Sequence, residues 1–399
     1  MTPAGQPSLW RAVLSGACAA LIGIGVARFA YTPLLPAVVS AGWFSSEAAA
    51  YLAAANLGGY LAGVLLAERF AARLSAVTTL RAAMVISTGS LLACAFQAGF
   101  NWFFLWRFAS GVAGGVIMVL AAPLILAHAP PARRGLIGGF IFMGIGLGIA
   151  ASGTLVPLLL RQGVGQAWIG LAVTTAMLTA VAWGGWPNPP APAPAPAKAE
   201  RHSRRPPRHR LTLLHFEYAL NAVGLVPHMV FLAVFVAHGL NQGVDAAGFY
   251  WVLFGLGALV GPLVFGHLAD RAGHDRALRL VLLLEAAATL APAVWNAPAA
   301  LACSSLFMGA ATPGIVPVVL GRAHELAGSG LADQRAAWRI ATTGFAAAQA
   351  VAAYGLAFVL SASQGAYGLI FALGAGALLL AFLIDVVGEA VVRPRTRRA

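Results

Sequence analysis

Long apolar segments constrain this chain more than any other feature, because each matches the thickness of a membrane's hydrocarbon core. A helix needs about 20 mostly apolar residues to cross a bilayer. The 399-residue sequence contains twelve such segments. They are residues 12–38, 48–67, 77–98, 102–126, 135–160, 165–186, 213–238, 247–268, 278–296, 299–321, 337–360 and 365–387. The pattern predicts an all-α membrane protein with 12 transmembrane helices.

The composition points to the same class. Apolar residues make up 60% of the chain and charged residues only 9%, whereas a soluble domain carries about 25% charged residues. The net charge of +13 does not indicate a nucleic-acid partner. Lys and Arg lie in short clusters between apolar segments, not along one face of a soluble fold.

The positions of these basic residues predict the orientation. With both termini in the cytoplasm, 22 of the 25 Lys and Arg fall at the termini or in the even-numbered connections. Arg161 falls in an odd-numbered connection, and Arg28 and Arg107 lie within spans. The positive-inside rule therefore predicts a multi-pass protein of the inner membrane with cytoplasmic N- and C-termini.

A Pro-rich and then basic stretch divides the spans into two sets of six. Residues 187–212 contain repeated Ala-Pro pairs followed by the basic run Arg201 to Arg210. This composition is typical of an extended, solvated linker, and its basic end is suited to contact with membrane lipid. The predicted organisation is a six-helix half (1–186), a cytoplasmic linker (187–212) and a second half with a basic tail (213–399).

The two halves share a faint internal repeat. Gly59 is followed nine residues later by Glu68-Arg69, and Gly261 is followed nine residues later by Asp270-Arg271. The two patterns are 202 residues apart. Together with the six-plus-six layout, they predict duplicated halves, as in transporters built on parallel repeats.

Two local motifs carry a family resemblance. Residues 266–276, Gly-His-Leu-Ala-Asp-Arg-Ala-Gly-His-Asp-Arg, resemble the loop between the second and third helices of a half in the major facilitator superfamily. Residues 23–36, Gly-Ile-Gly-Val-Ala-Arg-Phe-Ala-Tyr-Thr-Pro-Leu-Leu-Pro, resemble the first helix of its YbfB/YjiJ-type subfamily. The resemblance implies two pseudo-symmetric six-helix halves and alternating access.

The same resemblance implies a gate latch at the cytoplasmic side. Its expected residues are Gly266, Asp270, Arg271, Gly273, Arg276, Glu68 and Arg69. The first-half copy is degraded, because Ala71 is expected where the second glycine of the motif belongs.

Charged and polar residues inside the spans are the candidates for substrate contact, because a charge near the bilayer centre costs about 2.5–3.5 kcal/mol or more. The predicted substrate-binding residues are Arg28, Tyr31, Arg107, Asn221 and His228. Arg28 is expected to bind an anionic group of the substrate. The alternative for Arg28 is a structural role as the partner of a carboxylate or of helix carbonyls. Arg107 could instead snorkel to the membrane surface or bond to the backbone of the first helix.

Three further residues are candidates for carrying a coupled proton: Glu217, Glu285 and His228. Glu285 lies near the centre of an apolar span, where an anion is costly, and the charge of a histidine changes readily near neutral pH. The alternatives are a neutral, hydrogen-bonded acid at 285, an interfacial carboxylate at 217 and a satisfied core histidine at 228.

The sequence offers little for enzyme or metal chemistry. It contains no Walker loop and no H-E-x-x-H pattern. Cys18, Cys94 and Cys303 lie in apolar segments without the spacing of a metal site or a disulfide framework. No enzyme activity, cofactor or metal is therefore expected.

The function predicted on these grounds is secondary active transport of a small organic solute. We expect a monomer that works by alternating access, coupled to protons, and carries an organic anion or an amino-acid-like compound. The alternatives are a multidrug or sugar exporter of the same fold, and a non-transporting membrane sensor or scramblase.

Overall fold

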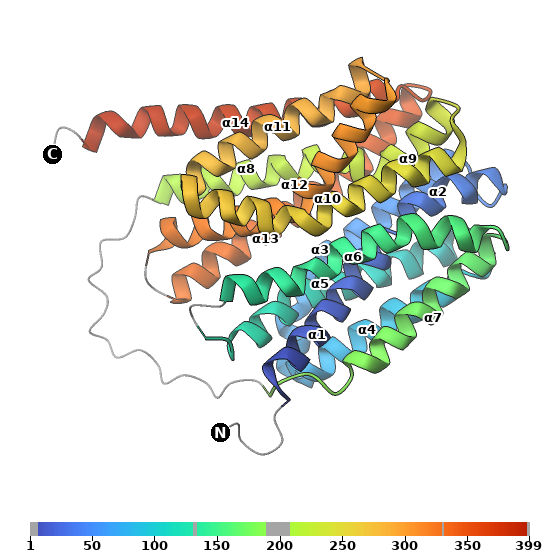
Figure 1. The fold of residues 1–399 in the computed structure, drawn as a ribbon, viewed down its shortest axis with the longest axis horizontal. Helices are drawn as coiled ribbons and strands as arrows, with labels where there is room; N and C mark the ends of the chain where they lie inside the picture. Colours follow the sequence, from blue (N-terminus) through green and yellow to red (C-terminus); the bar gives the residue numbers. More distant parts are fainter. Residues whose placement is uncertain (1–6, 131–133, 189–207, 329–330, 397–399) are drawn as a thin grey trace.

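A computed structural model describes residues 7–130, 134–188, 208–328 and 331–396. In these residues twelve helices are long and apolar enough to cross a membrane, in agreement with the predicted number (Figure 1). The first six spans are α1 (Leu9–Ala20) with the π-helix η1 (Leu21–Val26) and α2 (Tyr31–Ser40), α3 (Ser46–Leu74), α4 (Ala76–Ala93), α5 (Phe100–Leu126), α6 (Arg134–Leu160) and α7 (Val164–Ala182).

The last six spans form the second half. They are α8 (Arg208–Val226) with η4 (Pro227–Phe231), α9 (Leu232–Val234) and η5 (Phe235–Gly239), α10 (Gly243–Ala272), α11 (His274–Val294), α12 (Pro298–Ala327), α13 (Leu331–Ala362) and α14 (Tyr367–Thr396). Several helices extend beyond the predicted apolar segments. Their additional turns are polar, and the end of a helix need not coincide with the end of its apolar stretch.

The bundle has two ends that serve as references below. At the linker end α7 finishes and α8 begins, and α1 also starts there (Figure 1). At the far end α2 connects to α3 (Figure 1). Most of the predicted linker falls in residues 189–207, outside the described residues, so its conformation stays a prediction.

Glycines at helix crossings repeat between the halves. A Cβ atom at Gly59 or Gly63 of α3 would lie 2.0 or 2.1 Å from the carbonyl oxygen of Phe108 or Val112 on α5. The equivalent contacts between α10 and α12 are Gly257 with Leu306 at 2.0 Å and Gly261 with Ala310 at 1.9 Å. Each C-half residue follows its N-half counterpart by 198 positions, so backbone approaches backbone in the same way in both halves.

The offset of 198 residues differs by four residues, about one helical turn, from the 202 residues predicted from the sequence repeat. The predicted alignment of the two halves was therefore wrong by one turn. The counterpart of Gly273 is Ser75, not Ala71. Ser75 adopts φ 79° and ψ 152°, and Gly273 adopts φ 87° and ψ 148°. The pair Asp270-Arg271 corresponds to Ala72-Arg73, so the first half keeps the arginine of the motif but not its acid.

The seam between the halves is formed by α6 with α10, α3 with α13, and α2 with α9. Along α6 and α10 the backbones are close, since a Cβ at Gly146 would lie 2.6 Å from the Leu259 nitrogen and one at Gly255 would lie 2.4 Å from the Ala150 Cα. Along α3 and α13 the contact is made by side chains, with the rings of Tyr51 and Tyr354 6.4 Å apart.

The buried apolar residues form a large core that both halves share, a small shared cluster of Tyr60, Val64 and Ala346, and two clusters that each belong to one half. The shared core includes Leu34, Leu52, Phe231 and Phe254. Toward the linker end, each half has its own cluster, one around Met84 and Ile125, the other around Leu278 and Val318. The halves are therefore joined most firmly toward the far end.

Candidate substrate site between the halves

The α-helix of the first span is interrupted around Arg28, one of the predicted substrate-binding residues. The π-helix Leu21–Val26 is followed by residues 27–30, which connect it to α2. Interruptions of this kind are common at functional sites, because they leave backbone carbonyls free to accept other donors. Here the Ala27 carbonyl accepts a hydrogen bond of 2.7 Å from Nη1 of Arg107.

Arg28 reaches from the first half into the second. Its Nη2 donates to Oε1 of Gln349 on α13. The guanidinium carbon lies 5.3 Å from the ring centre of Phe29 and 5.1 Å from that of Tyr60. Nε of Arg28 is buried and has no hydrogen-bond partner in the structure. No ion pair joins Arg28 to a carboxylate among the described residues.

Arg107 is buried more deeply, with 2% of its surface exposed. Besides its bond to Ala27, its guanidinium carbon lies 4.4 Å from the ring centre of Tyr31. The Tyr31 hydroxyl donates to the Ala49 carbonyl at 3.0 Å, which orients the ring. Asn56 of α3 donates from Nδ2 to the Arg107 carbonyl at 3.2 Å and to Ser110 Oγ at 2.7 Å. These contacts hold Arg107 rigidly against the broken first span.

The two arginines line one small cavity at the seam. The lining residues are Arg28, Phe29, Tyr31, Thr32, Ala53, Asn56, Leu57, Arg107, Met229 and Val230. The cavity measures about 20 Å³, which is enough for a water molecule but not for an organic solute. The conformation is therefore a closed one around this point.

Hydrogen bonds between the halves close the cavity on its far side. Thr32 Oγ1 donates to the Met229 carbonyl at 2.6 Å, and Ser40 Oγ lies 3.3 Å from His238 Nε2. Met229 belongs to the π-helix Pro227–Phe231 of the seventh span. Its Sδ also accepts from Nε2 of Gln349 at 3.5 Å. The broken first and seventh spans thus meet directly.

The structure places two of the predicted substrate residues elsewhere. Asn221 and His228 are both fully buried and do not line this cavity. Asn221 Nδ2 donates to Glu285 Oε2 at 2.6 Å, within the second half. His228 Nε2 lies 2.7 Å from Ser304 Oγ, also within the second half. Glu217, with 3% of its surface exposed, lines a separate cavity at the linker end.

The predicted latch residues are mostly solvent-facing. Asp270, Arg271 and Arg276 are exposed and form no ion pair among the described residues. Glu68 Oε2 lies 3.9 Å from Arg339 Nη1 across the seam, and both side chains are largely exposed. Such an exposed pair contributes little to stability.

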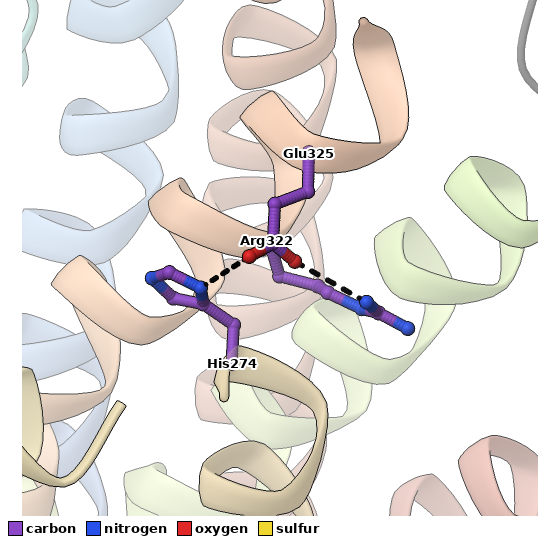
Figure 2. Close-up of polar contacts among 3 residues, drawn as sticks. All are labelled: His274, Arg322 and Glu325. Carbon is purple, nitrogen blue, oxygen red and sulfur yellow. Dashed lines mark hydrogen bonds and ion pairs between the residues drawn. The ribbon is translucent and has the colours of Figure 1, made fainter. Parts of the chain in front are cut away.

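A different set of charged residues ties the linker end of the second half together. Nδ1 of His274 lies 2.6 Å from Oε1 of Glu325, and Nη1 of Arg322 lies 3.3 Å from Oε2 of the same carboxylate (Figure 2). Arg279 of α11 pairs with Asp385 of α14. Sequence reasoning missed these residues, although Asp385 could have been found as a lone acid within the last apolar segment.

Other residues of the seam were also missed. Two hydrogen bonds join the halves there, from Thr32 to Met229 and from Arg28 to Gln349, and they connect positions 197 and 321 residues apart. No periodicity in the sequence relates such distant segments. Within the described residues, no group of three or more His, Cys, Asp or Glu is arranged to hold a metal ion.

Comparison with known proteins agrees with this architecture. Residues 20–386 match the family model described as uncharacterised MFS-type transporter YbfB. The chain belongs to this family of major facilitator transporters. It is a multi-pass membrane protein of a transporter family, which is not a class of enzymes.

One curated relative with a described function is similar over a short stretch. The 4-hydroxybenzoate transporter PcaK of Acinetobacter baylyi is 31% identical over 99 residues, which is 25% of this chain. The match spans 22% of the length of that protein. The similarity agrees with transport of a small organic solute. The name 4-hydroxybenzoate describes the substrate of PcaK and not that of this chain.

Proposed function

We propose that this transporter carries a small organic anion, with Arg28 as the contact for its carboxylate. The observation that supports this most directly is the half-buried guanidinium of Arg28, whose buried Nε has no hydrogen-bond partner and which lines an inter-half cavity without an acidic partner among the described residues. A buried charge without a counter-ion is costly, and an anionic ligand relieves that cost. Arg matches a carboxylate geometrically, because it can donate two parallel hydrogen bonds.

The cavity walls indicate what the rest of the anion resembles. Phe29, Tyr31, Leu57, Met229 and Val230 are apolar or aromatic, which suits a hydrophobic or aromatic body. The substrate of PcaK is an anion of this kind. We therefore favour an aromatic or apolar monocarboxylate over a sugar or a lipophilic cation.

Transport requires the closed cavity to open alternately on each side. Arg28 and Gln349 lie on opposite halves, so an incoming carboxylate competes with Gln349 for the guanidinium. Binding would weaken this connection and favour rocking of one half against the other. We place the protein in the inner membrane as a monomer with the linker end in the cytoplasm, and we propose protons as the coupling ion.

The test is a binding screen followed by exchange in proteoliposomes. Purified protein is heated with benzoate, 4-hydroxybenzoate, aliphatic carboxylates, amino acids, sugars and lipophilic cations. A ligand at 100 times its Kd stabilises the folded state by about 2.7 kcal/mol. We expect stabilisation by carboxylates, and exchange of the same compounds.

Two variants make the assignment specific. Arg28→Gln should abolish stabilisation and exchange. Arg161→Gln should keep both, because it removes one positive charge at an exposed position remote from the cavity. Carboxylate binding that survives in Arg28→Gln, or stabilisation confined to cations or neutral drugs, would refute the anion assignment and favour an exporter of the same fold.

A further inference from the structure

A buried polar track runs through the second half, away from the arginine cavity. Glu217, Asn221 and His228 are four and seven residues apart along the seventh span, so they share one face of it. That face packs against α11, α12 and α14. The three side chains are at most 3% exposed. Buried polar groups inside a membrane protein are expensive and are functional candidates by default.

The centre of this track is a pair formed by a carboxyl and an amide. Glu285 of α11 is fully buried, and its Oε2 accepts a hydrogen bond of 2.6 Å from Nδ2 of Asn221. No cation forms an ion pair with Glu285 among the described residues. An anion at this position would be stabilised by a single neutral donor, which is poor compensation for its burial.

Two atoms of the pair have no partner in the structure. They are Glu285 Oε1 and Asn221 Oδ1, and both are buried. If the carboxyl is ionised, both atoms are acceptors and cannot bond to each other. One proton on Oε1 would make that oxygen a donor, and the bonded amide of Asn221 still has an unused acceptor in Oδ1. A proton therefore suits this pair better than a second lone acceptor does.

The surroundings of Glu285 contain few other titratable groups. Tyr218 on α8 is buried and interacts electrostatically with Glu285. On α11 itself, Arg279 lies nearer the linker end and pairs with Asp385 of α14. From α12 the polar groups at this level are Ser304 and Ser305, and Oγ of Ser305 is also without a partner. None of these supplies a permanent counter-charge.

A small cavity lies at the linker end of the track. Glu217, one turn before Asn221, lines a cavity of about 20 Å³ with Arg210, Arg322 and Asp385 among its other walls. A cavity of this size holds a water molecule. Glu217 is thus placed to exchange a proton with a water molecule in this cavity, and it lies one helical turn from Asn221, which bonds to Glu285.

The other end of the track reaches the substrate cavity. One turn beyond Glu285, the Ala288 carbonyl accepts from Ser304 Oγ at 2.7 Å, and Ser304 contacts His228. His228 precedes Met229, whose carbonyl accepts from Thr32 and whose sulfur accepts from Gln349. The π-helix Pro227–Phe231 therefore touches the polar track on one side and the arginine cavity on the other.

We propose that Glu285, paired with Asn221, binds the coupled proton in the second half, and that Glu217 admits it from the linker end. The proton forms an O–H bond at Glu285 Oε1 and leaves from the same atom, so one proton is bound and released per cycle. Its effect reaches the substrate through Pro227–Phe231. This inference rests on the proposed transport function, but its first test does not.

The first test detects the proton itself. Infrared spectra of the purified wild-type protein and of Glu285→Gln are recorded from acid to alkaline pH. We expect a protonated-carboxyl carbonyl band that disappears on raising the pH and is absent from Glu285→Gln. Asp275→Asn, which removes a carboxyl from the same helix at its linker end, should retain the band. Asn221→Ala should raise its frequency, because the carboxyl loses a hydrogen bond.

The second test distinguishes a proton-binding role of Glu285 from a purely structural one. Gln at position 285 can form an amide–amide pair with Asn221, so a purely structural role is preserved in Glu285→Gln. We expect this variant to keep thermal stability and carboxylate exchange but to lose accumulation driven by a proton gradient. Accumulation equal to wild type would overturn the proposal.

An infrared band that does not change with pH, or one that persists in Glu285→Gln, would also overturn it. The two failures are distinguishable. If wild-type protein exchanges no organic anion, the proposed substrate class is wrong, while the infrared titration still decides whether Glu285 binds and releases a proton.

Discussion

Ser75 adopts a backbone conformation that favours glycine, and the equivalent residue in the other half is a glycine, Gly273. Its φ of 79° and ψ of 152° match the φ of 87° and ψ of 148° of Gly273. Residues other than glycine pay about 1–3 kcal/mol in this region. Ser75→Gly should therefore relieve strain at the turn between α3 and α4.

The net effect is smaller than the strain, because two terms oppose it. Ser75 Oγ accepts from the Thr78 nitrogen at 3.2 Å, and replacing such a cap by glycine costs a few tenths of a kcal/mol. The more flexible unfolded chain costs about 0.4–1 kcal/mol. We expect a net stabilisation of about 1 kcal/mol, which corresponds to about 2–4 °C if a half of about 190 residues unfolds as a unit.

The reverse change at the equivalent turn is the matched control. Gly273→Ser introduces the same strain between α10 and α11, and it should lower the midpoint by a few degrees. Both variants are compared with wild type by thermal unfolding in detergent micelles. A lower midpoint for Ser75→Gly together with an unchanged one for Gly273→Ser would show that the backbone at these turns is not strained in this way.

Two further predictions concern packing and charge. Gly309→Ala places a methyl group 1.9 Å from the Phe254 carbonyl oxygen and should destabilise the protein by about 1–3 kcal/mol. Gly266→Ala, also within a helix but with nothing within 4 Å, should not lower the unfolding midpoint, because it removes only flexibility from the unfolded chain. Asp385→Asn removes the half-buried partner of Arg279 and should lower the free energy of unfolding by about 1.5–3 kcal/mol. Asp270→Asn, at an exposed position without an ion pair among the described residues, should not change the unfolding midpoint. Equal effects of Asp385→Asn and Asp270→Asn would show that the Arg279–Asp385 pair does not stabilise the protein.

Much of the fold follows from local rules that act within a single span. Apolar segments long enough to cross a bilayer predict the number of helices, and the structure confirms all twelve. The motif with Asp270 and Gly273 was located correctly at the turn between α10 and α11. Its first-half copy was placed one turn too early, because Glu68-Arg69 imitates the acid–base pair while the turn itself requires a positive φ at Ser75.

The candidate site is less predictable for a physical reason. Arg28, Arg107 and Glu285 stand out in the sequence because a charge inside an apolar segment is costly wherever the segment packs. The pairing of these residues does not. Asn221 was predicted to bind substrate, whereas the structure pairs it with Glu285. Which residue lies opposite Arg28 or Glu285 depends on helix packing, and packing is decided by contacts between residues far apart in the chain.

At equivalent positions the two halves share the glycines of their helix crossings but not their polar residues. Gly59, Gly63 and Gly111 recur as Gly257, Gly261 and Gly309, because close helix crossings tolerate no side chain in either half. At the same offset Arg107 corresponds to Ser305, Asn56 to Phe254, and Ser87 to Glu285. The first half thus holds the cation and the second half the buried carboxyl, although their helices pack alike. A site made of two identical halves would bind the same group twice. The asymmetry supports the proposed function, in which the first half binds an anion and the second half binds a proton.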